Sequence, residues 1–382
     1  MPLDHQVVAR KLRQARELQS LAVEVVSQAT GIATIRIGSI ESGQSKPSGD
    51  EVLILANFYR HDFRDFLADN RPAPFEQTDI LYRRHGNAFT SEDRRAIQEF
   101  LYLCEIESSL EAELAVSKVS FAFTPHGRHY KSHAEPAATM LRTLLGYVSN
   151  AIPRDVFEDF RRVGFHVFRR RLINSEISGL FIEHPVAGNC ILVNYDEDVY
   201  RQRFSVSHEA AHAIFDSSEA VMVTYRKGSS HYDERDLKEI RANRFASCYL
   251  MPPALLPCVP QWTIEQATSW AQKLRVSTIA LSIALRDAGL VDESIARMIR
   301  SVKVPYAEKI DPEAPTNLTD KQRDRRIALL ERGLSDYYVG LCFEAHHQGM
   351  ISAGRLGEAL LSDHAETREI SVLYGRAINN GT

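Results

Sequence analysis

The pattern of apolar and polar positions predicts that the first 67 residues form a compact set of short helices. Val7, Val8, Leu12 and Ala15 lie at helical spacing, and the Thr30-Gly31 pair makes a tight turn into a further helix over 33–41. Short helices joined by a glycine turn are the sequence form of a helix-turn-helix. The next segment is expected to supply core side chains: Leu53, Leu55, Ala56, Phe58 and Tyr59.

The middle of the chain changes from helical to strand periodicity and back. A proline-containing linker over 69–74 precedes a long helical pattern over 91–119. Strands are predicted near 165–168, 177–183 and 190–194, and the turn over 184–189 can close a hairpin between the last two. Helical patterning then runs from about 201 to 300, and a linker over 304–316 precedes a final helical segment that begins at a capping box of Thr319 and Gln322.

These elements predict a mainly α chain with a small β-sheet, in the α+β class. We divide it into a helix-turn-helix domain (1–68), a linker with a helical extension (69–135), a third domain with the candidate chemistry (136–303), and a linker with a C-terminal helical segment (304–382). In this last segment four aromatic residues at helical spacing fit either a core or a homodimer contact: Tyr337, Tyr338, Phe343 and Tyr374.

Composition narrows the class of protein. The 382 residues are 44% hydrophobic and 25% charged, as in ordinary globular proteins, and no apolar stretch of about 18 residues predicts a membrane helix. The absence of a signal core and five dispersed cysteines favour a cytoplasmic protein with reduced thiols. With a net charge of −4, any DNA binding must come from a local surface. The arginine runs at 161–162 and 169–171 are typical of solvated faces.

The sharpest chemical signal is the sequence His208-Glu209-Ala210-Ala211-His212. Residues i and i+4 share one helix face, so both imidazoles can bind the same cation. Glu209, one position further round, can contact a water molecule beside the cation without being a ligand. The alternative interpretation is a pair of solvated histidines on an amphipathic helix.

A catalytic zinc site needs a third protein ligand and an open position. Glu239, 27 residues after His212, is the best candidate, because it begins a helical stretch over 239–252. Asn243 lies one turn later, where it can orient a ligating histidine. Spacing alone leaves three nearby acids as competitors: Asp233, Glu234 and Asp236.

The run RQRFSVSHEAAHAIF (201–215), followed by ExxANxFA and LMP, resembles the ImmA/IrrE family of zinc metallopeptidases over about 140–300. The resemblance implies a zincin-like domain in which His208, His212 and Glu239 hold Zn²⁺ and Glu209 is the general base. Members of the family act mainly as endopeptidases on a partner transcriptional repressor, which relieves repression under stress or during mobile-element induction. Peptide cleavage also needs a hydrogen-bond donor that stabilises the negatively charged oxygen (the oxyanion) of the reaction intermediate. Three residues nearby in the sequence are candidates, and none is assigned: Tyr225, His231 and Tyr232.

Residues 30–47 resemble the xenobiotic-response-element (XRE) type of helix-turn-helix, with 33–41 as the recognition helix. The resemblance implies that four side chains face the major groove of double-stranded DNA and that Lys46 holds a phosphate; the four are Thr34, Ile35, Arg36 and Ser39. Residues 1–67 carry eight basic and eight acidic side chains. A neutral module has little non-specific affinity for phosphates, so DNA binding and docking on a protein partner both remain open.

Together these features predict a zinc-dependent endopeptidase whose substrate is a repressor or an antitoxin-like regulator. The N-terminal module would bring it to DNA or to that partner. The alternative is a DNA-binding transcriptional regulator whose peptidase-like domain serves only as a sensor. The intact Glu209 favours the enzyme, because a sensor has no need of a base. The interpretation as a purely structural zinc site is less well supported still, because the sequence offers only three ligands and structural zinc sites usually have four.

Overall fold

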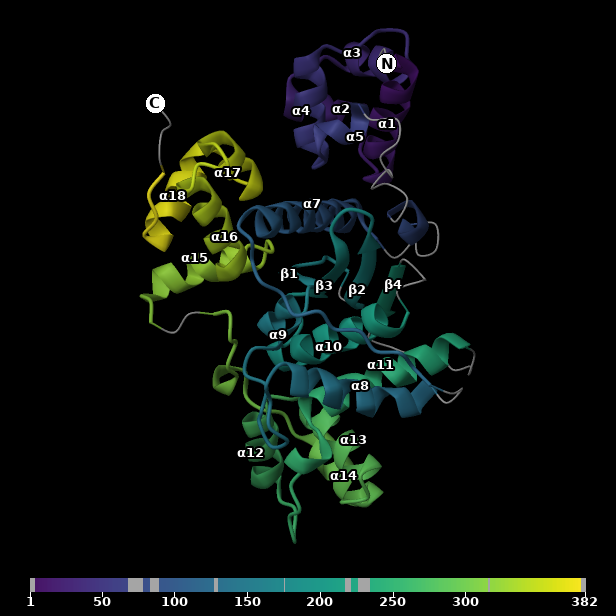
Figure 1. The fold of residues 1–382 in the computed structure, drawn as a ribbon, viewed down its shortest axis with the longest axis vertical. Helices are drawn as coiled ribbons and strands as arrows, with labels where there is room; N and C mark the ends of the chain where they lie inside the picture. Colours follow the sequence, from purple (N-terminus) through teal and green to yellow (C-terminus); the bar gives the residue numbers. More distant parts are fainter. Residues whose placement is uncertain are drawn as a thin grey trace.

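The computed structural model describes residues 4–67, 78–82, 89–126, 130–174, 176–216, 221–225, 234–314 and 317–378. It is mainly α-helical with one small four-stranded sheet, which confirms the predicted fold class (Figure 1). Within the described ranges we find no helix with the length and apolarity that crossing a bilayer requires.

The N-terminal domain consists of five short helices: α1 (His5–Leu18), α2 (Val23–Thr30), α3 (Thr34–Glu41), α4 (Gly49–Tyr59) and α5 (Phe63–Leu67). Gly31 ends α2 in the left-handed region at φ 74°, which glycine adopts without steric cost. Of the core residues expected in α4, Leu55, Ala56 and Tyr59 are buried. The expectation was wrong for Leu53, which is 48% exposed, because Val52 lies on the core face of α4 in its place.

The sheet contains β1 (His166–Arg170), β2 (Ile177–His184), β3 (Gly188–Asn194) and β4 (Val221–Tyr225), in the order β1-β3-β2-β4. β2 and β3 form the predicted antiparallel hairpin, and β1 pairs in parallel with β3. β4 pairs antiparallel with β2 and forms an edge of the sheet. The sequence analysis missed β4, a strand of five residues between two helical regions.

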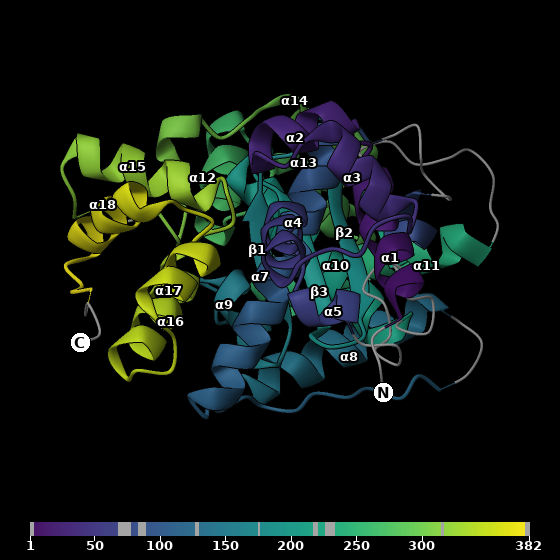
Figure 2. The same ribbon diagram turned by 90° about the horizontal axis from the view of Figure 1, so that it is seen from above.

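Helices cover both faces of the sheet (Figures 1 and 2). The long helix α7 (Ser91–Glu113) contacts β1 and β3. The hydrophobic core on this face of the sheet includes Leu180, Ile182 and Leu192. The second core includes Phe181 and Ile191 and is closed by α8 (Tyr130–Leu144), α9 (Val156–Arg162), α10 (Val199–Phe215) and α11 (Glu234–Leu250). Alternate residues of each strand therefore enter opposite cores, as the two-residue period of a strand requires.

The remaining helices extend these two cores. Three helices follow the short 3₁₀ turn Pro253–Leu255: α12 (Ile264–Leu274), α13 (Thr278–Asp287) and α14 (Glu293–Ser301). They contribute side chains to the same hydrophobic core as α10. The C-terminal helices pack with α7; they are α15 (Asp320–Leu330), α16 (Asp336–His347), α17 (Ala353–Ala359) and α18 (His364–Tyr374). Tyr338 and Phe343 are buried there, so these two aromatic residues serve the core.

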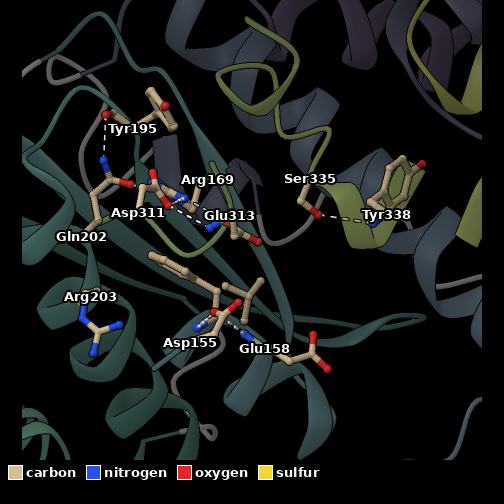
Figure 3. Close-up of polar contacts among 12 residues, drawn as sticks. Asp155, Glu158, Arg169, Tyr195, Gln202, Arg203, Asp311, Glu313, Ser335 and Tyr338 are labelled. Atoms are coloured by element: carbon tan, nitrogen blue, oxygen red, sulfur yellow. Dashed lines mark hydrogen bonds and ion pairs between the residues drawn. The ribbon is translucent and has the colours of Figure 1, made fainter. Parts of the chain in front are cut away.

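Residues 304–314, which include the 3₁₀ turn Tyr306–Glu308, lie against the sheet domain. The side chain of Arg169 is fully buried and forms two hydrogen bonds with Asp311, at 2.8 and 2.6 Å, and one with Glu313, at 3.0 Å (Figure 3). Arg161 is also buried and pairs with Glu313 at 2.7 Å. The expectation of solvated arginines was wrong for Arg161 and Arg169, because these carboxylates balance their charges inside the protein.

The N-terminal domain packs on α7 through backbone carbonyl groups. Arg94 and Gln98 of α7 donate to the carbonyl oxygens of Leu18 and Arg60, each at 3.0 Å. The helix α3 lies at the end of this domain that faces away from α7 (Figure 1). The expected recognition helix is therefore not covered by the described remainder of the chain.

Candidate functional site

The helix α10 holds both histidines of the HExxH sequence on one buried face. It begins at the N-cap Asp198, whose side chain accepts a hydrogen bond from the backbone N–H of Tyr200. His208 and His212, one turn apart, are 2% and 0% exposed, and their Nε2 atoms lie 3.1 Å apart. The helical placement expected from the sequence brings both imidazoles to one point.

Glu239 of α11 completes this group. Its Oε2 lies 3.2 Å from Nε2 of His208, and its Oε1 lies 3.6 Å from Nε2 of His212. One potential ligand atom from each of the three residues lies within 4.8 Å of the others. Of the competing acids, Asp233 and the side chain of Glu234 lie outside the described part of the chain, and Asp236 is not in the group.

The other ring nitrogen of each histidine is held by a polar side chain. Nδ1 of His208 lies 3.1 Å from Oδ1 of Asn243, the residue that the sequence suggested for this position. Nδ1 of His212 lies 3.0 Å from Oδ2 of Asp216, and Asp216 also pairs with Arg241. The sequence analysis missed Asp216, although its spacing of four residues from His212 placed it on the same helix face. These contacts leave both Nε2 atoms directed at Glu239.

Burial and neighbouring charges shift the pKa values of His208, His212 and Asp216. Burial disfavours charge on His208, but the carboxylate of Glu239 outweighs it and raises the pKa of His208 above its ordinary value. Burial lowers the pKa of His212, although Asp216 partly opposes that effect. Burial alone would raise the pKa of Asp216, yet its contacts with His212 and Arg241 hold it below the usual range. The partially exposed Glu239, with 28% of its side chain accessible, gives the cluster its access to solvent.

Glu209, the residue between the two histidines in the motif, is fully buried against the sheet. Its carboxylate lies over Gly179 of β2, and a Cβ atom added to Gly179 would be only 3.0 Å from Oε1. Gly179 in turn pairs with Thr224 of the edge strand β4. The motif glutamate therefore lies next to the edge of the sheet. Of the residues considered for the oxyanion, His231, Tyr232 and the side chain of Tyr225 lie outside the described part of the chain.

A second group of potential ligands is a hydrogen-bonded network. Nδ1 of His166 lies 2.8 Å from Oε1 of Glu107. The neighbouring Glu111 accepts a hydrogen bond of 2.5 Å from the hydroxyl of Tyr337 and pairs with Lys118. Protein groups therefore already contact one carboxylate oxygen of Glu107 and both of Glu111.

The helix-turn-helix presents a less polar surface than the sequence implied. Ile35 is 85% exposed on α3, and Lys46 is exposed in the turn that follows. Arg36, by contrast, is bound by both carboxylate oxygens of Glu51, each at 2.7 Å. Thr34 and Ser39 are half-buried.

Comparisons with known proteins agree with this architecture. Residues 160–286 match the model of the IrrE N-terminal-like domain, a peptidase family, and residues 12–66 match that of the helix-turn-helix. The chain thus combines a peptidase-type domain with a DNA-binding type of module. It carries the ImmA/IrrE domain behind an XRE-type helix-turn-helix, which confirms the resemblance seen in the sequence. No curated protein matches the chain.

Proposed function

We propose that this protein is a zinc-dependent endopeptidase that cleaves a transcriptional repressor or an antitoxin-like regulator. The observation that carries the proposal is the convergence of His208, His212 and Glu239 beside the buried Glu209. The ImmA/IrrE match over 160–286 contains all four residues. The assignment of zinc ligands and base is part of the proposal.

The chemistry of the three side chains fits zinc. Two imidazoles and one carboxylate form a common catalytic zinc set, and three protein ligands leave a position open. Asn243 and Asp216 hold the Nδ1 atoms, so the Nε2 atoms are free to act as ligands. When bound, zinc polarises a carbonyl group and lowers the pKa of water from ~15.7 to ~7.

In this proposal Glu209 moves the proton. Its carboxylate accepts a proton from the attacking water and passes it to the leaving amine, which general-base catalysis in a peptidase requires. The burial of Glu209 against β2 holds the carboxylate in one place and excludes bulk water. Its position one residue after His208 keeps it beside the metal cluster but outside the ligand set.

The edge strand β4 offers a way to hold an extended substrate. In the described sheet β4 pairs with β2 on one side only, and the peptide groups along a free edge can pair with an incoming strand. Because Thr224 pairs with Gly179, this edge lies beside Glu209. A substrate chain added to β4 would therefore pass close to the metal cluster.

The helix-turn-helix would bring the peptidase to DNA or to the regulator bound there. The test is to incubate the full chain with candidate repressors encoded beside its gene, with and without a chelator. Chelator-sensitive cleavage of one of them supports the peptidase, and Glu209→Gln should abolish it. Operator binding by a chain that cleaves none of them would instead support the regulator with a sensor domain.

A further inference from the structure

The outward face of α3 exposes one large apolar side chain, that of Ile35. Ile35 is 85% exposed, whereas Ile37 and Ile40 of the same helix are fully buried. Gly38 lies one turn after Ile35, and a Cβ atom added there would meet nothing within 4 Å. On this part of α3 the large side chain that is most exposed is therefore a hydrocarbon, that of Ile35.

The one cationic side chain of α3 is already committed within the domain. Arg36 binds both oxygens of Glu51 and also donates to the backbone carbonyl of Lys46, at 2.9 Å. Glu51 in turn accepts from the backbone N–H of Ser48 in the capping box that begins α4. If Arg36 turned towards a guanine, it would give up these three hydrogen bonds.

The hydroxyl groups of Ser39 on α3 and of Ser42, which caps the helix, are also engaged. Ser39 donates to the carbonyl oxygen of Ile35 at 2.9 Å, and Ser42 donates to that of Ser39 at 3.2 Å. Neither hydroxyl proton is left for a base without breaking a contact. Hydrogen-bonded readout through Arg36, Ser39 or Ser42 would therefore break existing contacts, whereas an apolar contact of Ile35 with a base would break none.

We propose that Ile35 reads the 5-methyl group of thymine in the major groove of double-stranded DNA. In a helix-turn-helix the N-terminal residues of the recognition helix contact base edges, and Ile35 is the second residue of α3. The methyl group is the apolar mark that distinguishes thymine in that groove. The missing side chain at Gly38 lets the helix approach the base edges closely. The inference rests on the DNA-binding part of the proposed function.

One observation favours DNA over a protein partner for this face, and a second shows that the face is accessible. Ile35 is the single large hydrophobic residue that α3 exposes, whereas a docking surface needs a contiguous apolar patch. In Figure 1 α3 lies at the end of the domain that is away from α7, so a duplex can reach it.

The experiment uses the full-length chain and a selection from randomised DNA duplexes at one fixed salt concentration, since protein–DNA affinity depends on salt. In the enriched duplex each thymine is then replaced by uracil, which removes only the methyl group. For the wild-type chain we expect about fourfold weaker binding per contacted methyl group. For Ile35→Ala the same replacement should have no effect.

The control is Ile279→Ala, because Ile279 is also an exposed isoleucine, at 51%, but lies on α13. This variant should keep the sensitivity to uracil. Equal binding of thymine and uracil duplexes by the wild type overturns methyl readout and leaves DNA binding intact. A selection that enriches no duplex overturns both this inference and the DNA-binding part of the proposed function, whereas the peptidase is tested separately by cleavage.

Discussion

The carboxylate of Glu209 on α10 lies where a side chain on residue 179 of β2 would crowd it, so the glycine at this position, Gly179, gives the carboxylate its place. A Cβ atom on residue 179 would lie 3.0 Å from Oε1 and 3.1 Å from Cγ of Glu209, and 3.0 Å from the carbonyl oxygen of Leu192. Ordinary Cβ contacts are longer, and the backbone oxygen cannot easily move. The glutamate would have to shift instead.

Gly179→Ala should therefore impair catalysis without removing the metal. A misplacement of about 1 Å can lower the rate about 100-fold. The shift needed here is a few tenths of an ångström, so we expect kcat to fall by about 3- to 10-fold. Zinc content should stay at the wild-type level, because none of the three proposed metal ligands is displaced. The matched control is Gly340→Ala, at a position where a Cβ atom meets nothing within 4 Å. An unchanged kcat in Gly179→Ala would show that the contact does not position the base.

Asp216 should govern metal affinity through His212. Its carboxylate holds Nδ1 of His212 at 3.0 Å and is itself bound by Arg241. Mutation of a residue that holds a ligating histidine in this way typically weakens metal binding by about 10- to 100-fold. We expect that loss in Asp216→Asn, measured by competition with a coloured chelator. Asp287→Asn, which alters a partially exposed carboxylate on α13, should bind zinc as the wild type does. Equal affinities in both variants would contradict a role for Asp216.

The segment that contains Asp311 and Glu313 should contribute strongly to stability. In the double variant Asp311→Asn, Glu313→Gln, the fully buried Arg169 loses the anionic partners seen here, and Arg161 loses Glu313. Breaking a buried ion pair in this way costs about 3–5 kcal/mol in the free energy of unfolding. Urea denaturation measures the change, and Glu308→Gln, an exposed carboxylate in the same segment, is the control. A loss below about 1 kcal/mol would mean that the segment is not fixed by these pairs.

The Arg36–Glu51 pair should make a pH-dependent contribution to the stability of the N-terminal domain. The hydrogen bonds from Arg36 lower the pKa of Glu51 from 4.5 to about 2. A carboxyl group with a depressed pKa stabilises the folded state above its unfolded pKa, and that stabilisation disappears as the pH falls through the folded value. The difference in stability between wild type and Glu51→Gln should thus be constant above about pH 5 and shrink between pH 4.5 and 2. A difference independent of pH would contradict the pairing.

Local patterns were sufficient to predict most elements. The helical periodicity of the first 67 residues and the β2–β3 hairpin are both signals within a short window, and both appear in the structure. The spacing of four residues between His208 and His212 likewise predicted one shared face. In each case the interacting residues are neighbours in the sequence.

Contacts between distant segments escaped prediction for a physical reason. Arg169 looks like a solvated residue in its own run of arginines, and only the approach of Asp311, 142 residues later, makes its burial tolerable. Gly179 carries no signal of its role until α10 packs across β2. The commitment of Arg36 to Glu51 also depends on how α3 packs on α4. Sequence periodicity identifies the apolar face of a helix or strand, but it does not identify which other element packs against that face.

The most direct test of the account is the zinc content per chain of the wild type and of Glu239→Ala. We predict about one zinc ion per wild-type chain and almost none in Glu239→Ala, with an unchanged circular dichroism spectrum. Glu209→Gln should hold as much zinc as the wild type, because Glu209 is outside the ligand set. A wild-type chain that binds no zinc, or a Glu239→Ala chain that binds as much as the wild type, would contradict the proposed metal centre.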